Sequence, residues 1–246
     1  MRCHLAQASA IRKRAKGALE LEQIFRTVKD TTCPRFYNFH MHTVCSDGRL
    51  QPEELMQQAI DLGLHGLAIT DHHSVQGYYQ ARQWFEDWQW RNPRSAMVRQ
   101  PDRPMLKLWT GIEINAELLG IGVHILGYGF YADHDALQPY LQRNGVSHHS
   151  SDYAAVAVIG AIQDAGGLAV LAHPSRGRYQ RSPEALIQEA AALGIDGVEV
   201  YYAYDNPSPW RPSPEQTTQV LPLVRKLGLL TTCGTDTHGR SLLQRI

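Results

Sequence analysis

The chain of 246 residues has no apolar run that approaches the roughly 18 residues needed to cross a membrane. Its first 30 residues also lack the continuous apolar stretch of a secretory signal peptide. No CxxC pair occurs, which argues against a zinc ribbon or a thioredoxin-like motif. The cysteines are Cys3, Cys33, Cys45 and Cys233. We therefore expect a cytoplasmic protein without membrane association, whose thiols are free, with Cys45 and Cys233 as small packing residues.

The chain lacks an excess of either charge, because 24 basic residues balance 24 acidic ones. This balance argues against broad electrostatic binding to nucleic acid or to a membrane, although a local basic site is compatible with it. The basic run at residues 12–16 is short, so we interpret it as the solvated start of a helix rather than a nucleic-acid-binding arm. Histidine is in excess: the 12 histidines are about twice the number that composition alone would predict.

Two parts of the chain differ in their patterns. Residues 1–35 combine the basic run with apolar residues at helical spacing, which predicts an accessory helical segment. In residues 36–246 strand and helix signals alternate, which predicts one α/β domain with a mainly parallel sheet. The expected strands are 36–41, 64–70, 105–113, 123–128, 168–172, 197–201 and 229–233. The expected helices are 52–62, 74–90, 151–165, 182–193 and 215–226. About seven strands over this length predict a barrel or near-barrel, with an active site at the C-terminal ends of the strands.

Histidine and acidic residues follow the ends of five predicted strands, where the active site of such a barrel lies. The clusters are His40 and His42 with Asp47; Asp71, His72 and His73; Glu113 with His124; His173; and Asp236 with His238. Because residues two apart in a strand point to the same side, His40 and His42 can bind one ion together, as can Asp236 and His238.

Each cluster alone also has an ordinary structural interpretation. An isolated HxH is usually a pair of surface histidines, Asp71 suits helix capping, and His124 between two apolar residues suits a buried core histidine. Five such clusters together favour a metal centre, because histidine and carboxylate ligands suit Zn²⁺, Mn²⁺ or iron. The ligands outnumber what one ion needs, so two or three divalent ions are expected. Centres with several ions typically hydrolyse phosphate esters.

The motifs resemble those of the PHP family, named after polymerases and histidinol phosphatases. The matching motifs span roughly residues 36–240 in the family's order: HxHxxxxD at 40–47, TDH at 70–72, Glu113 with His124, HP at 173–174 and GTDTH at 234–238. The resemblance implies a distorted seven-stranded (β/α) barrel of PHP type and three metal sites. The implied ligand sets are His40, His42, Glu113 and Asp236; Asp47, His72 and His238; and Glu113, His124 and His173, with Glu113 bridging.

Within the family, the stretches ITDH, GIEI, VHILGYGF and AHPSR are most similar to one branch. That branch removes phosphate from nucleoside 3′,5′-bisphosphates or trims RNA from its 5′ end. Two departures leave the substrate open. His73 stands where many relatives have an acid, and only 48 residues separate His124 from His173, where the branch carries a longer helical insertion.

The resemblance implies hydrolysis of a phosphate ester by in-line attack of a metal-bridging hydroxide. We expect Asp71 to orient a ligand histidine, His73 to protonate the leaving group, and Arg176 or Arg178 to clamp the phosphate. Solvated loop arginines are an equally good interpretation of the last pair. The expected substrate is a phosphorylated small molecule, a nucleotide or a short nucleic acid, and no obligate protein partner is expected.

Two other functions remain open. One is a PHP module that binds metal but has little or no activity, which the complete set of ligand types disfavours. The other is a metal-dependent hydrolase of C–N bonds on a similar barrel, which the GTDTH motif fits less well.

Overall fold

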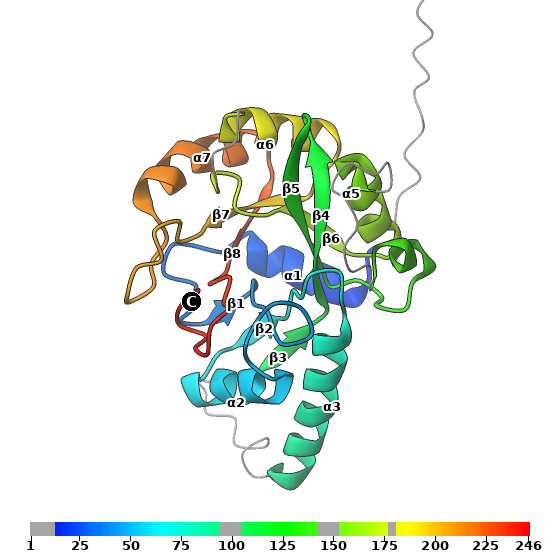
Figure 1. Cartoon of the computed structure of the whole chain (residues 1–246), viewed down its shortest axis with the longest axis vertical. Coiled ribbons are helices and arrows are strands. Elements are labelled where there is room, and N and C mark those ends of the chain that lie inside the picture. The colour runs from blue at the N-terminus through cyan, green and yellow to red at the C-terminus, as the bar shows by residue number, and fades with distance from the viewer. Residues whose placement is uncertain (1–12, 94–104, 142–152, 177–180) are drawn as a thin grey trace, which may run out of the picture.

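The computed structural model describes residues 13–93, 105–141, 153–176 and 181–246 (Figure 1). The described helices are α1 (Lys16–Phe25), α2 (Pro52–Leu62), α3 (Gln76–Arg91), the 3₁₀ helix η1 (Asp135–Tyr140), α5 (Ala155–Asp164), α6 (Pro183–Ala192) and α7 (Pro214–Lys226). The strands are β1 (Tyr37–Asn38), β2 (Gly66–Ala68), β3 (Lys107–Trp109), β4 (Gly111–Leu118), β5 (Ile121–Tyr128), β6 (Leu168–Leu171), β7 (Gly197–Tyr201) and β8 (Leu230–Cys233).

The strands form two sheets. The parallel strands β1-β2-β3 make one, and β4-β5-β6-β7-β8 make the other, in which β4 and β6 both run antiparallel to β5. Outside these strands, isolated β-bridges pair Met41 with Thr237 and His72 with Glu113. The predicted α/β class is confirmed, whereas the predicted closed seven-stranded barrel is not. Strands as short as β1 and β2 leave only single bridges where a barrel would need continuous ladders.

The predicted strand 105–113 is two strands, β3 and β4. At Gly111 a Cβ atom would lie 2.4 Å from the carbonyl oxygen of Ile69, so this close approach requires glycine. The chain then continues as β4 to Leu118 and turns back through Leu119 and Gly120, whose φ angles are 55° and 77°. Because β4 and β5 are joined by this tight hairpin, they pair antiparallel rather than parallel.

The predicted helices are present, with ends shifted by at most a few residues. Helix α2 begins at Pro52, has a capping box formed by Gln51 and Glu54, and ends at Gly63 in the left-handed conformation. Ser182 caps α6 by accepting a hydrogen bond from the Ala185 N–H. Among the described helices, none is long and apolar enough to cross a membrane.

Helix α1 packs into the main core, although it was predicted only as an accessory segment. Leu21 and Phe25 are fully buried, and the Phe25 ring contacts Phe39 and Tyr128 at centroid distances of 4.9 and 5.4 Å. Arg14 in the basic run is only partly exposed and is paired with Asp196, while Arg12 lies outside the described residues. A domain boundary at residue 35 remains a proposal.

Two cysteines are not free, which corrects the expectation from sequence. Cys33 and Cys233 form a disulfide whose Cα atoms lie 6.0 Å apart, across a sequence separation of 200. The bond joins the segment after α1 to the end of β8, and spacing in the sequence cannot reveal such a pairing. Cys45 is free, and Cys3 lies outside the described residues. The argument for a cytoplasmic location from reduced thiols is therefore lost.

Candidate metal centre

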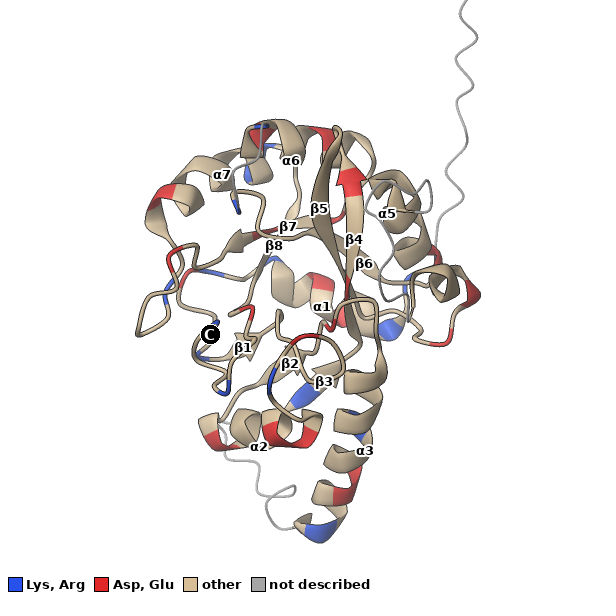
Figure 2. Cartoon of the chain, viewed as in Figure 1, with Lys and Arg blue, Asp and Glu red and all other residues tan. Residues whose placement is uncertain are grey.

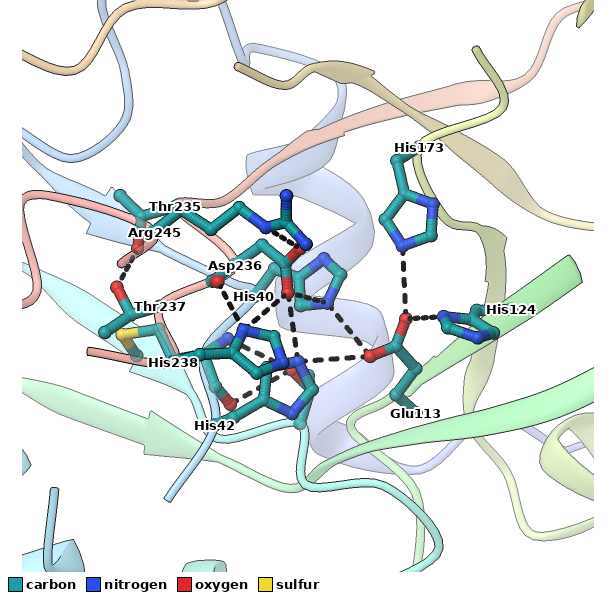
Figure 3. A network of polar contacts seen from close by, with 12 residues as sticks. His40, His42, Glu113, His124, His173, Thr235, Asp236, Thr237, His238 and Arg245 are labelled. Atoms are coloured by element: carbon teal, nitrogen blue, oxygen red, sulfur yellow. Dashed lines mark hydrogen bonds and ion pairs between the residues drawn. The ribbon is translucent and has the colours of Figure 1, made fainter. Parts of the chain in front are cut away.

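The predicted ligands come from several different segments of the chain. Figure 3 shows the following ligands gathered in one network of polar contacts: His40, His42, Glu113, His124, His173, Asp236 and His238. His40 and His42 follow β1, and Asp236 follows β8. The Asp236 N–H donates to the His40 carbonyl oxygen over 2.8 Å, which holds the two segments side by side. Gly234 makes this approach possible, because a Cβ there would lie 2.2 Å from that of His40.

Four buried side chains form what we call the buried group: His40, His42, Glu113 and Asp236. Glu113 Oε2 lies 3.1 Å from Nε2 of both histidines. Asp236 Oδ1 lies 3.2 Å from His40 Nε2 and 3.1 Å from His42 Nε2. Two imidazole nitrogens and two carboxylate oxygens therefore converge on one point, in a donor set suited to a divalent ion.

A second set, the open group, consists of His42, Asp47, His72 and His238. Asp47 Oδ2 lies 3.2 Å from His238 Nε2 and 3.9 Å from His72 Nε2. The Asp47 side chain is 56% exposed, whereas those of His72 and His238 are 23% and 22% exposed. This group therefore faces solvent.

A third set, the hairpin group, consists of His72, Glu113 and His124. Glu113 Oε1 lies 2.8 Å from His124 Nδ1 and 3.4 Å from Nε2 of His173, which borders the group. Glu113 thus directs Oε2 at the buried group and Oε1 at the β5 and β6 histidines, as Figure 3 shows. One carboxylate lies between two possible ion positions.

The electrostatics of the buried group favour positive charge. Burial alone would lower the pKa of His40, but Glu199, Glu113 and Asp236 outweigh it and raise that pKa well above its ordinary value. Burial likewise opposes protonation of His42, yet hydrogen bonds to Asp236 and Glu113 raise its pKa to about 9. Burial opposes ionisation of the two acids, but the neighbouring histidines hold their pKa values well below the usual range.

The histidines on the other side behave in the opposite way. Burial, helped by the neighbouring His42 and His124, lowers the pKa of His72 to about 4. Burial also lowers the pKa of His173. Both imidazoles are therefore neutral near pH 7, which is the form that binds metal.

Unsatisfied polar atoms indicate that ions fit this cluster. The Nδ1 atoms of His42, His72 and His173 are buried and have no hydrogen-bond partner among the residues that the structure describes. His42 Nδ1 lies 3.7 Å from Asp47 Oδ1, in the open group. A buried imidazole nitrogen without a partner is costly, and a cation between it and a carboxylate would satisfy both.

Two residues that support the cluster were missed by the sequence analysis. Glu199 is fully buried in β7; its Oε1 lies 2.9 Å from His40 Nδ1, and its Oε2 accepts from the His173 N–H over 3.0 Å. Tyr202 donates its hydroxyl hydrogen to Asp236 Oδ2 over 2.6 Å. The acid inside the apolar run Gly197–Tyr201 was the available signal, because a buried carboxylate requires a partner.

The three predicted catalytic residues have different surroundings. Asp71 contacts no described histidine: it accepts from the N–H and hydroxyl of Thr43 and from the Ser46 hydroxyl, each at 2.7 Å. It therefore holds the loop that carries Asp47, and its expected role in orienting a ligand histidine stays a prediction. His73 accepts from the Asn115 N–H at Nε2, and its Nδ1 lies 2.9 Å from the Tyr140 carbonyl oxygen. Both of its ring nitrogens therefore contact backbone groups, and its role as a proton donor stays a prediction.

Arg176 contacts two of the predicted ligands. Its Nη1 is 3.2 Å from both Asp236 Oδ2 and His173 Nε2, and its side chain is 32% exposed. Arg178 lies outside the described residues. Arg245, which the sequence analysis did not single out, donates from Nε to Asp236 Oδ2 over 3.0 Å.

Comparisons with known proteins agree with the predicted family. Residues 38–126 match the family described as PHP domain. The 5′-3′ exoribonuclease Rnm of Salmonella typhimurium is 31% identical over 114 residues, which is 46% of this chain and 34% of the relative. The chain thus spans about a third of the length of that curated relative.

Two solved structures share the fold. A candidate metal-dependent phosphoesterase from Bifidobacterium adolescentis has a TM-score of 0.63 at 24% identity, covering 84% of this chain and 89% of that one. An amidohydrolase from Chromobacterium violaceum has a TM-score of 0.62 at 20% identity, covering 82% and 87%. The region that matches the PHP domain family, residues 38–126, contains the HxH, TDH and Glu113–His124 motifs.

Proposed function

We propose that this chain is a metal-dependent phosphoesterase that hydrolyses the ester of a phosphorylated metabolite, a nucleotide or a short oligonucleotide. The observation that carries the proposal is the position of Glu113, whose two oxygens face two different sets of histidines. This arrangement suits two or three divalent ions, of manganese, zinc or iron, in neighbouring sites. The curated relative named as an exoribonuclease supports a phosphodiester or nucleotide substrate.

The nine predicted ligands would hold the ions, with Glu113 shared between sites. When bound, divalent ions polarise phosphoryl oxygens and lower the pKa of water towards neutrality. The substrate would enter from the open group, because Asp47, His72 and His238 are its exposed members. Arg176 would contact a phosphoryl oxygen through its guanidinium group beside Asp236. Asp71 would keep Asp47 in place by holding its loop.

The test is an activity panel with the Mn²⁺-loaded protein. The substrates are a nucleoside 3′,5′-bisphosphate, histidinol phosphate, a short 5′-phosphorylated RNA and p-nitrophenyl phosphate. Hydrolysis of at least one, abolished by a chelator and restored by Mn²⁺, is expected. Metal-loaded protein that is inert on every ester would contradict the proposal.

The structural neighbour described as an amidohydrolase makes C–N hydrolysis the second candidate. N-acyl amino acids and cyclic amides belong in the same panel, measured at the same metal loading. Turnover of an amide with no turnover of any ester would replace the first proposal by the second.

A further inference from the structure

Residues 239–246, which we call the 239–246 segment, contact both helix α2 and the loop that carries Asp236 and His238. The segment contains no helix or strand, and Figure 1 shows it (red) beside β1 and next to α2. Backbone N–H and carbonyl groups outside a helix or sheet need other partners when they are buried. The partners that this segment uses therefore show which parts of the molecule hold it.

Helix α2 holds the middle of the segment in two ways. The side chain of Leu242 is fully buried, in the same apolar cluster as Leu55 and Met56 of α2. The side-chain amide of Gln58 pairs with the backbone: Nε2 donates to the Arg240 carbonyl oxygen over 3.0 Å, and Oε1 accepts from the Leu242 N–H over 3.1 Å. One apolar side chain and one amide with two hydrogen bonds thus attach the segment to the helix.

The end of the segment is attached to the loop that carries two predicted ligands. The Arg245 carbonyl oxygen accepts from the His238 N–H over 2.6 Å, and Arg245 Nε donates to Asp236 Oδ2 over 3.0 Å. Between the two ligands, the Thr237 hydroxyl donates to the Gln244 carbonyl oxygen over 2.8 Å. Asp236 belongs to the buried group and His238 to the open group, so one segment supports a ligand of each.

The charges of α2 and of the segment are complementary. Figure 2 shows acidic residues and no basic residue on α2, whereas the segment contains Arg240 and Arg245 but no acid. Attraction between exposed charges is screened by salt and stabilises little. The directed hydrogen bonds of Gln58 are therefore the part of this attachment that a single substitution can test.

We propose that Gln58 is a positioning residue of the metal centre, which acts through residues 240–245 on Asp236 and His238. The proposal rests on the metal centre of the function proposed above. Within the described chain, both hydrogen bonds of the Gln58 side chain end on the backbone of the segment. Their loss frees that backbone to shift Arg245, and the ligands of such a site must be held within about 0.5 Å of their working positions.

The direct test is the affinity of Gln58→Met for Mn²⁺, measured by calorimetry. Methionine keeps the length of the side chain and removes both hydrogen bonds. Affinity for the tightest and for the weakest ion should fall about 3- to 10-fold, because the loss reaches the ligands through the segment rather than directly. Equal affinities in Gln58→Met and in the wild type would overturn the proposal.

Gln57→Met is the matched control. It is the same substitution on the same helix, and it removes a hydrogen bond that Gln57 Nε2 donates to Asp61 Oδ1 within α2. This variant should bind Mn²⁺ as the wild type does. Equal losses of affinity in Gln57→Met and Gln58→Met would overturn the proposal, because the effect would then come from α2 as a whole.

The absorption spectrum of the Co²⁺-loaded protein separates positioning from support of the fold. A displaced ligand changes the coordination geometry, so the visible spectrum of Gln58→Met should differ from that of the wild type and that of Gln57→Met should not. Urea unfolding of the metal-free variants measures stability independently. A less stable Gln58→Met with the wild-type Co²⁺ spectrum and Mn²⁺ affinity would show that Gln58 supports only the fold.

A double-mutant cycle tests the path from Gln58 to the ligands. Arg245→Met removes the contact of the segment with Asp236. If Gln58 acts through this contact, the losses of affinity for the tightest ion in Gln58→Met and Arg245→Met should be less than additive in the double variant. Additive losses would show that the two residues act independently and would overturn the path.

Metal binding is measured without a substrate, so failure of this proposal is distinguishable from failure of the proposed function. If the wild-type protein hydrolyses no ester but Gln58→Met still loses metal affinity, the phosphoesterase proposal fails and the positioning role stands. Unchanged metal binding by Gln58→Met in an active enzyme would overturn only the positioning role. A wild-type protein that binds neither Mn²⁺ nor Co²⁺ would overturn both.

Discussion

The buried group and the open group share His42, yet they are built differently. Every side chain of the buried group is at most 1% exposed, and Glu199 and Tyr202 hold its members from behind. The open group depends on Asp47, which is 56% exposed on a loop that Asp71 holds. An ion in the buried group would therefore be held by side chains that the core fixes in place. An ion in the open group would depend on a loop that can adjust to the substrate.

The largest effect is expected from removing an acid of the buried group. Asp236→Asn leaves the buried histidines facing a neutral group, so the apparent affinity for the tightest ion should fall more than about 100-fold, beyond the range of outer-shell changes. Asp61→Asn, on the exposed face of α2, is the control. Metal titrations followed by calorimetry measure the change, and unchanged binding would exclude Asp236 as a ligand.

A smaller effect is expected from the residue behind His40. Glu199→Gln keeps the size of the side chain but loses the charge that orients the Nδ1–H of His40, so affinity for the tightest ion should fall about 10- to 100-fold. Glu199→Asp should recover part of the loss. Glu215→Gln, an exposed acid at the start of α7, should have no effect. Equal metal affinity in Glu199→Gln and the wild type would mean that Glu199 serves only packing.

Loosening the loop should affect the open group alone. Asp71→Asn weakens the hydrogen bonds to Thr43 and Ser46, so the weakest-bound ion should lose about tenfold in affinity while the tightest is retained. Stepwise metal removal with a chelator distinguishes the weakest-bound ion from the tightest-bound ion. Loss of both ions together would show that the groups are one cooperative unit rather than two separately built sites.

The buried group and the hairpin group, which contains His72 but not His42, should also differ in pH dependence. The pKa of His42 is raised to about 9, so an ion entering the buried group must displace its proton, and affinity should rise as pH increases from neutrality to about 9. The pKa of His72 is lowered to about 4, so this histidine is already deprotonated and imposes no such dependence over that range. Proton release on metal binding, measured in buffers of different ionisation enthalpy, should fall between pH 7 and 9. Constant release would contradict the pKa difference.

The cluster was predictable from sequence because most of its residues lie at the ends of predicted strands. His40, His72 and His173 each follow a short apolar stretch, and the order of motifs along the chain resembles that of the PHP family. Glu199 was missed because one acid in the alternating sequence Val-Glu-Val also fits a strand with a solvated face. Only the burial of both strand faces reveals that it needs a partner.

Other features depended on contacts between distant parts of the chain. The hairpin at Leu119 and Gly120 replaced a parallel connection, and its local signal was only one glycine. The disulfide between Cys33 and Cys233 and the contact of Arg245 with Asp236 join segments whose proximity no local pattern encodes. His73, whose φ angle is 52°, contacts the backbone of Asn115 and Tyr140, and no local pattern encodes these contacts either.

The most direct test of the account is metal stoichiometry in the protein and in Glu113→Gln, measured by inductively coupled plasma mass spectrometry after loading with Mn²⁺ and desalting. Glu117→Gln, the same substitution on the same strand outside the three ligand groups, is the control. Because Glu113 faces both the buried and the hairpin groups, the account predicts two or three ions per chain in the protein and in the control, and loss of more than one in Glu113→Gln. A single ion per chain in the protein, or unchanged metal in Glu113→Gln, would contradict a shared carboxylate at the centre of the site.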